Sequence, residues 1–262
     1  MERQKASIKI LRTVLSNALP LLLVTACTHT MDMSKCKELF AEFPVDPVVA
    51  QRHVPASYSV RIADNGKATL LLMIQDCEMG VLDQIIPIKP LKMSHIWIEI
   101  QGPEEVGPIL PGTNKSLPTA YYYILPHQVE SKLAHVSLAL AGIGSQLVDE
   151  ISIGRRTNDQ RRGRVLENGP SVGYEWVETS HMLPTQGLVT GRRKFYRQYE
   201  AQTMWTSSGT VSTWANFLGK GQVVLTASPD SSIGRLGFGI TLEGIAQPVE
   251  MDCHAEIKVR SR

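Results

Sequence analysis

Alternating apolar and polar residues predict that most of the chain beyond residue 56 forms β-strands. The segment HIWIEIQG, residues 95–102, shows the pattern most clearly, because side chains of a strand point to opposite faces in turn. One face carries three isoleucines and the other a histidine, a tryptophan and a glutamate: Ile96, Ile98 and Ile100 against His95, Trp97 and Glu99. The segment YEWVE repeats the second arrangement with Tyr174, Trp176 and Glu178.

Further strand-like segments follow one another with Gly, Pro or Asn between them. They cover 119–125, 148–154, 163–168, 171–180, 209–219, 221–230, 236–244 and 254–259. The segments 57–62 and 67–76 flank Asp-Asn-Gly, which predicts a hairpin, since Asn-Gly accommodates positive φ. Helical spacing appears in 129–142, where Val129, Leu133, Val136 and Leu140 recur before Gly142. The pattern predicts a mainly β (α+β) fold, an antiparallel barrel or sandwich with one central helix.

The first 26 residues are typical of a secretory signal peptide, with a basic start, a short apolar middle and a small-residue end. The end, Val24-Thr25-Ala26-Cys27, resembles the lipobox of bacterial lipoproteins, in which the cysteine is acylated and becomes the first mature residue. That resemblance implies a lipid anchor on Cys27 in the cell envelope, and Thr28 in place of Asp favours the outer membrane. We expect 1–26 to be the signal peptide, 27–43 a lipidated tether with one helical turn in 34–43, and 44–262 a single β-rich domain.

Charge and cysteine usage narrow the choice of partners and compartment. The chain holds 27 basic and 25 acidic residues, and removing 1–26 leaves 23 against 24. A near-neutral mature chain gives no reason to expect a nucleic-acid partner. In an oxidising compartment a disulfide is possible, and Cys77 with Cys253 is the candidate pair because both lie at strand edges; free thiols are the alternative.

Two stretches together resemble acetoacetate-decarboxylase-like proteins. The segment 45–76 resembles the opening of that family, and 129–154 resembles its central helix and strand, which meet at a Gly-x-Pro-Lys turn. The resemblance implies a β-barrel, and in the decarboxylases the turn lysine forms a Schiff base with a keto acid. Here the turn reads GIGSQL, and the lysine position falls on 144–146, where no amine is present. The resemblance therefore implies the fold without Schiff-base chemistry.

The candidate site residues come from the alternation. If the two aromatic faces line the barrel, His95, Trp97, Tyr174 and Trp176 are ligand-binding candidates, and Glu99 or Glu178 can act as acid or base, because burial raises a carboxyl pKa. The alternative is that these faces point outward. Arg193, on a strand with three further basic residues, can bind a ligand carboxylate. The sequence holds no recognised catalytic or phosphate-binding motif, and we expect no metal and no cofactor.

Three functions stay open at this point. The first is a membrane-anchored envelope lipoprotein that binds a small, mostly apolar ligand, with or without a carboxylate. The second is an enzyme on the same scaffold that uses a carboxylate as acid or base. The third is an envelope interaction or scaffold protein, for which a filled barrel and an exposed apolar patch would be the signs.

Overall fold

The computed structural model describes residues 28–102, 119–140, 144–155, 160–181, 185–199, 203–217 and 221–261. For strands β10 and β11 and for residues from 246 onward it describes the backbone alone. The strands are β1 (Thr28–Val45), β2 (Ala68–Leu82), β3 (Ile86–Ile88), β4 (Leu91–Glu99), β5 (Thr119–Val129), β6 (Gln146–Leu147), β7 (Glu150–Arg155), β8 (Arg161–Leu166), β9 (Gly173–His181), β10 (Thr185–Tyr199), β11 (Thr203–Phe217), β12 (Gly221–Ala227) and β13 (Thr241–Ser261). The helices are α2 (Pro47–Arg52), α3 (Lys132–Leu140) and the 3-10 turn η3 (Gly234–Leu236).

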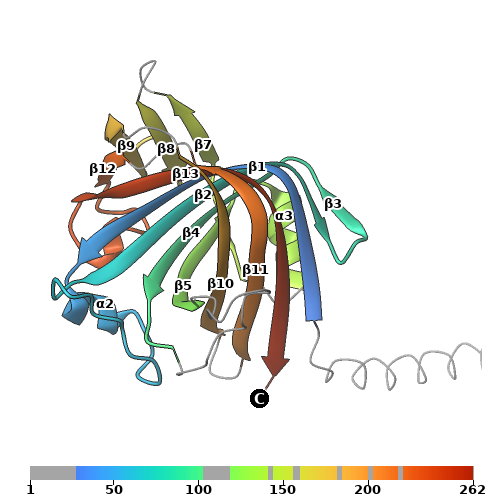
Figure 1. The fold of residues 1–262 in the computed structure, drawn as a ribbon, viewed down its shortest axis with the longest axis horizontal. Helices are drawn as coiled ribbons and strands as arrows, with labels where there is room; N and C mark the ends of the chain where they lie inside the picture. Colours follow the sequence, from blue (N-terminus) through green and yellow to red (C-terminus); the bar gives the residue numbers. More distant parts are fainter. Residues whose placement is uncertain are drawn as a thin grey trace, which may run out of the picture.

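The strands form one curled sheet that closes on itself. Its order is β1-β2-β4-β5-β10-β11-β13, and β13 pairs again with β1 along most of its length. A second layer, β12-β9-β8-β7, continues from the other edge of β13 and folds back so that β7 lies against β2 and β4 (Figure 1). The structure thus confirms the mainly β fold, and it combines the barrel and the sandwich that the sequence left as alternatives.

The shared wall of the two layers, β1, β2, β4 and β5, is covered on both faces. A strand buried on both faces reads as a continuous apolar run, which explains the run from Leu70 to Ile74. One face packs against β7–β9 and β12 and forms what we call the sandwich core. The other faces the inside of the closed ring and forms the barrel core, to which α3 contributes Ala134 and Leu138. In Figure 1, α3 lies within the curl between β11 and β1.

The tether expected for 27–43 is wrong for the part that the structure describes, because β1 begins at Thr28 and runs to Val45. The folded domain therefore begins by Thr28, at least 16 residues before residue 44, where the sequence predicted its start. The exposed lysines Lys35 and Lys37 gave this segment a solvated appearance. Between them and Val45, however, apolar residues alternate and are buried: Leu39, Ala41, Phe43 and Val45.

Tertiary contacts changed two local predictions, the hairpin around Asn65-Gly66 and the buried face of α3. The turn around Asn65-Gly66 is present, with Gly66 at a φ of 74°, but residues 57–62 do not pair with β2. Val60 instead bridges Ile100. Helix α3 is present as predicted, yet two of the residues that predicted it are exposed, Leu133 by 52% and Val136 by 53%. The helix turns Ala134, Ser137 and Leu138 inward instead.

The disulfide joins Cys36 to Cys77, so the expected Cys77–Cys253 pair is wrong. Cys36 lies directly opposite Cys77 across the β1–β2 ladder, with a Cα–Cα distance of 4.0 Å. Cys253 lies on β13, which borders β1 and not β2, and its partner in register is Met33. Only the strand order could place these three cysteines.

Of the helices within the described residues, none has the length and apolar character needed to cross a membrane.

Replacing both disulfide cysteines, Cys36→Ala with Cys77→Ala, should lower the free energy of unfolding by about 3 to 4 kcal/mol. This is the entropy that a cross-link over a sequence separation of 41 removes from the unfolded chain. Urea unfolding followed by tryptophan fluorescence measures it. The reduced wild-type chain should show a similar loss, and Cys253→Ala a smaller one; equal stability of oxidised and reduced protein would contradict the prediction.

Candidate functional site

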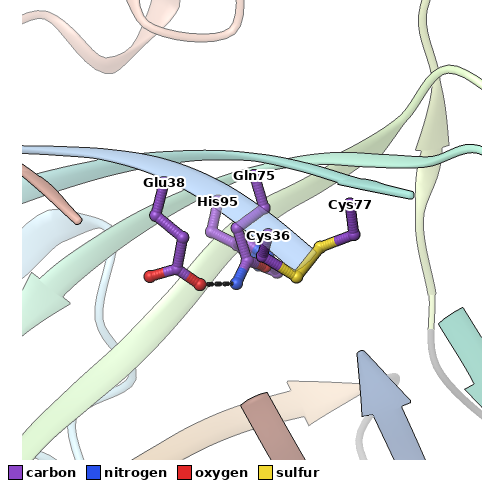
Figure 2. The surroundings of a disulfide bond; sticks show 5 residues. All are labelled: Cys36, Glu38, Gln75, Cys77 and His95. Atoms are coloured by element: carbon purple, nitrogen blue, oxygen red, sulfur yellow. Dashed lines mark hydrogen bonds between the residues drawn. A yellow bond between two sulfur atoms is a disulfide. The ribbon is translucent and has the colours of Figure 1, made fainter. Parts of the chain in front are cut away.

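Three neighbouring strands of the barrel place a row of polar side chains in the barrel core. Glu38 on β1, Gln75 on β2 and His95 on β4 are all buried. The Gln75 amide donates to Glu38 Oε1, and its own oxygen lies 3.1 Å from His95 Nε2. Figure 2 shows this row beside the disulfide. A polar row of this kind, surrounded by apolar side chains, is the most distinctive chemical feature of the interior.

The direction of these hydrogen bonds fixes the tautomer of His95. A carboxylate only accepts hydrogen bonds, so the amide nitrogen of Gln75 faces Glu38 and its oxygen faces His95. His95 Nε2 therefore donates, and Nδ1 carries the lone pair. Burial lowers the pKa of His95 to about 3, so the ring stays neutral at physiological pH and offers one hydrogen-bond acceptor.

Aromatic rings surround the end of this row. The ring of His127, on β5, meets that of His95 edge to face at 4.3 Å between centroids. Between ring centroids, Trp97 lies 5.3 Å from His95 and 5.6 Å from Tyr122. Phe40 is the last ring of the group, with its centroid 6.5 Å from that of Trp97. The flexible side chains of Met73 and Met93 are buried in the same core. Such an environment suits a mostly apolar molecule with one polar group.

The disulfide holds the two strands that carry the first part of the row. Cys36 and Cys77 are each two residues from Glu38 and Gln75 along their strands, so all four side chains share one face. Between Met33 and Cys36 the β1 ladder contains an irregularity, with Lys35 at a φ of 51°. A one-residue slip of β1 would turn Glu38 to the opposite face. The cross-link prevents that slip on the site's side of the irregularity.

A second polar network is hydrogen-bonded to β4 and β5 on their opposite face, in the sandwich core. The Tyr174 hydroxyl donates to Gln128 Oε1 at 2.6 Å and lies 2.7 Å from Ser94 Oγ. Gln128 in turn donates to Glu167 at 3.0 Å, whose two oxygens also accept from the Ser232 backbone N–H at 2.9 Å. Burial raises the pKa of Tyr174 well above its usual value, so the hydroxyl remains a donor.

Two members of this network are the immediate sequence neighbours of the two histidines in the barrel core. Ser94 directly precedes His95 and Gln128 directly follows His127, so these two side chains point to the sandwich core while the histidines point into the barrel. Its hydrogen bonds are satisfied among its own members, which marks it as structural. It fixes the two strands on which the histidine pair depends.

The predicted site residues are divided between the two cores. His95 and Trp97 lie together in the barrel core. Tyr174 and Trp176, stacked at 6.4 Å, belong to the sandwich core on the other side of the wall, so the two aromatic faces do not line one pocket. The side chain of Arg193 lies outside the described set; its backbone on β10 is in register with Ala120 of β5. Cys27 also lies outside the described residues.

The two candidate carboxylates are each placed beside an arginine. Glu99 is hydrogen-bonded to Arg61, whose side chain is 60% exposed. Glu178 is buried, with Arg161 at 4.0 Å. Neither belongs to the Glu38–Gln75–His95 row. Sequence reasoning missed Glu38 because the segment around it was interpreted as a tether, and a strand reading of 36–43 would have placed it on the face of Cys36 and Phe40. It missed Gln75 because the predicted strand 67–76 is mostly a continuous apolar run, whose faces no alternation assigns.

The turn at which the family resemblance would place a Schiff-base lysine is described from Gly144 onward. Ser145 Oγ lies 2.9 Å from His135 Nδ1, and Gln146 accepts from Ser232 Oγ at 3.3 Å. Among the lysine side chains that the structure describes, only Lys92 is partly buried, and it pairs with Glu130 at 3.3 Å. In the same residues, no three His, Cys, Asp or Glu side chains gather where they could hold a metal ion.

Two surface grooves, of about 470 and 500 Å³, open elsewhere. The first lies where the ends of β1 and β2 meet β12 and β13, and the second beside α2. Neither is lined by the polar row. We place the candidate site in the barrel core because the grooves lack a comparable arrangement of convergent buried polar groups.

Comparison with solved structures identifies the architecture. The enduracididine biosynthesis enzyme MppR, solved in complex with pyruvate, superposes with a TM-score of 0.52 at 12% identity over 91% of both chains. Acetoacetate decarboxylase from Legionella pneumophila gives a TM-score of 0.56 at 8% identity over 88% of this chain and 87% of that one. The fold is that of acetoacetate decarboxylase.

An acetoacetate-decarboxylase-like enzyme from Sphingomonas wittichii RW1 shares this fold, with a TM-score of 0.51 at 12% identity, covering 92% of this chain and 96% of that one. No family model matches the sequence, and no curated protein matches it. At these identities the likeness shows the acetoacetate decarboxylase fold alone, and function has to be argued from the site.

His95 should make the protein less stable in mild acid. Its pKa is near 6.5 in the unfolded chain and about 3 in the folded one, so between these values the unfolded chain binds more protons. Stability is then constant above pH 6.5 and falls as the pH drops toward 3, with a loss of about 2 kcal/mol at pH 5.

Urea unfolding at pH 7.5 and pH 5 measures this difference. His95→Gln should shrink it by that amount, whereas the matched variant His53→Gln, outside the barrel core, should keep the His95 contribution. An NMR titration that gives His95 a pKa near 6 would refute the assignment.

Proposed function

We propose that this protein is a lipid-anchored bacterial envelope protein that binds a small, mostly apolar molecule inside its barrel. The observation that carries the proposal is the neutral His95 at the end of the Glu38–Gln75 row, facing a surround of aromatic and methionine side chains. A buried acceptor among apolar walls supplies orientation to a ligand whose affinity comes from apolar contact.

The tautomer of His95 determines which kind of ligand group can form a hydrogen bond with it. Because Nδ1 carries the lone pair, the ligand group beside it has to donate a hydrogen bond, as a hydroxyl or a protonated acid does. An ionised carboxylate at that point has no proton to donate to the lone pair of Nδ1. It would also lie near the carboxylate of Glu38, at the other end of the same row. A carboxylated ligand would therefore place its carboxylate elsewhere, and Arg193 of the barrel strand β10 is the predicted partner.

The solved neighbours support a small-molecule role for this fold. MppR was solved with pyruvate bound, and other neighbours are decarboxylases. We propose that this chain keeps the scaffold without Schiff-base chemistry, because the segment 144–146 offers no amine and the described lysine side chains are exposed or, for Lys92, paired.

The binding role is favoured over an acid–base enzyme by the same side chains. A general base works best with a pKa near the operating pH, whereas burial holds the pKa of His95 at about 3. Glu99 and Glu178, the candidates from the sequence, are each beside an arginine and outside the row.

The envelope location rests on two independent features. The lipobox-like Val24-Thr25-Ala26-Cys27 ends one residue before the folded domain begins. The disulfide between Cys36 and Cys77 is of the kind that persists in oxidising compartments and is rare in the cytosol.

Native mass spectrometry of the protein purified from its host should detect a retained small molecule. His95→Phe should lower its occupancy about 5- to 150-fold, the effect of leaving a buried donor of the ligand without its acceptor, about 1 to 3 kcal/mol. His53→Phe, which removes a histidine outside the barrel core, is the matched control. Equal occupancy in both variants would place the ligand elsewhere, and an empty wild-type protein would argue for a scaffold role.

Borohydride reduction in the presence of keto acids should leave every lysine unlabelled, because the expected Schiff-base position has no amine. Peptide mass mapping measures this. A keto-acid adduct on any lysine would refute the absence of Schiff-base chemistry while leaving the binding site untouched.

Mass analysis of the N-terminal peptide should show a chain that begins at an acylated Cys27. An intact Met1 with an unmodified sulfur at Cys27 would refute the anchor and leave the barrel site unaffected.

A further inference from the structure

The start of β1 identifies one end of the barrel. Because the neighbours of β1 run antiparallel to it, β2 and β13 both end where β1 begins: Met31 pairs with Leu82, and Thr28 with Lys258. The alternation continues around the ring, so β4 begins and β5 ends toward the same end; Leu91 lies level with Cys36, and Val129 lies level with Glu38. The segment with the lipobox-like sequence therefore enters the fold here, with Cys27 directly before the first strand residue.

Helix α3 follows β5 and contacts β3, which pairs with the part of β2 that lies opposite Met31 and Met33 near the start of β1. Its inner face, with Ala134 and Leu138, belongs to the barrel core. Its outer face exposes Leu133 and Val136, by 52% and 53%. Leu147, which pairs beside Val129 at the end of β5, is 37% exposed. An amphipathic helix would normally bury such residues, so this outer face lacks an apolar partner within the described part of the chain.

The tip of the β2–β3 hairpin adds the most exposed large apolar side chain of this end. Ile85 is 79% exposed and follows Asp83 and Gln84, both with positive φ, in a tight turn next to the level of Met31. Strand β3 also contacts α3. The β2–β3 hairpin and α3 are thus neighbouring elements, and we call their exposed apolar residues, together with Leu147, the anchor-end surface: Ile85, Leu133, Val136 and Leu147.

Basic residues accompany this surface. Lys132, at the start of α3, and Lys89, after β3, are exposed. The backbone of β13 brings Lys258 opposite Thr28 and continues to Arg260. The acidic Glu130 is already paired with Lys92. The other acidic positions at this end are Asp83 in the turn, Asp32 on β1 and Glu256 on β13, opposite Thr30. Apolar side chains next to lysines are what a membrane surface with anionic headgroups selects.

We propose that the anchor-end surface rests on the bilayer, so that α3 and the β2–β3 tip dip into the headgroup region when the lipid on Cys27 is inserted. The proposal depends on the anchor of the proposed function. It follows from the start of β1 at Thr28: with no spacer between the acylated residue and the first strand, this end of the barrel has to lie at the membrane. The lipid and the apolar side chains then act together, as two-signal anchors do.

The opposite end of β1 supplies an internal control. Val48, on α2, is 65% exposed, and Ile62, beside it in the second groove, is 56% exposed. They lie near the other end of β1, past Val45, and the curved 18-residue strand has a contour length of roughly 60 Å at about 3.3 Å per residue. An anchored barrel keeps these two residues in water.

The test uses the full-length acylated protein in vesicles of phosphatidylethanolamine and phosphatidylglycerol. In a Cys253→Ser background, Ile85→Cys, Val136→Cys and Val48→Cys each receive a thiol-reactive, polarity-sensitive fluorophore, and lipids with a nitroxide on the acyl chain serve as quenchers. At positions 85 and 136 we expect a blue-shifted emission and at least a threefold stronger quenching than at position 48. The mass of the N-terminal peptide, taken from the same sample, reports acylation separately.

The outcomes separate the two proposals. Acylated protein with equal, weak quenching at all three positions would overturn the membrane-facing surface and leave the anchor standing. A blue shift at 85 and 136 without lipid quenching, together with a dimer by crosslinking, would assign the surface to a second copy and also overturn it. Protein without acylation would refute the anchor, and Cys27→Ser protein whose label at 85 is still quenched by anionic vesicles would show that the surface binds lipid by itself.

Discussion

The pairing of β1 with strands on both of its sides is the constraint on which the rest of the structure depends. β1 joins β2 on one edge and β13, the last strand of the chain, on the other. This contact between the two ends of the chain closes the sheet and gives it an inside. Without this contact, β1 would become an edge strand with apolar residues on both faces, a form prone to pair with other chains. The disulfide reinforces one of the two pairings.

Closure creates one wall that serves two cores. The strands β2 and β4 send alternate residues into the barrel and into the sandwich layer, so the environment of each residue depends on its parity. Ser94 and His95 illustrate this, since one is hydrogen-bonded to Tyr174 in the sandwich core and the other to Gln75 in the barrel. The two strands that carry the histidines of the barrel core are fixed by a polar network on their opposite face, in the sandwich core.

The same geometry relates the candidate site to the membrane. The site lies among β1, β2, β4 and β5, and α3 packs Ala134 and Leu138 into the same core, together with Met31 and Met33 from the start of β1. In the proposed orientation an apolar ligand held at His95 would be separated from the bilayer by α3 and its exposed leucine and valine.

The sequence by itself determined the strands with a clear two-residue period, β4 and β5 among them, the presence of α3 and the class of fold, because side-chain alternation is a local property. It also brought out His95 and Trp97 correctly as one face. It could not determine the partners of β1, the Cys36–Cys77 bond or the buried face of α3, since each depends on which distant segment lies alongside. The row in the barrel joins Glu38 to Gln75 across 37 residues and Gln75 to His95 across 20. Only the closed sheet brings these three side chains together, because hydrogen bonding between strands, and not spacing along the chain, sets their distance.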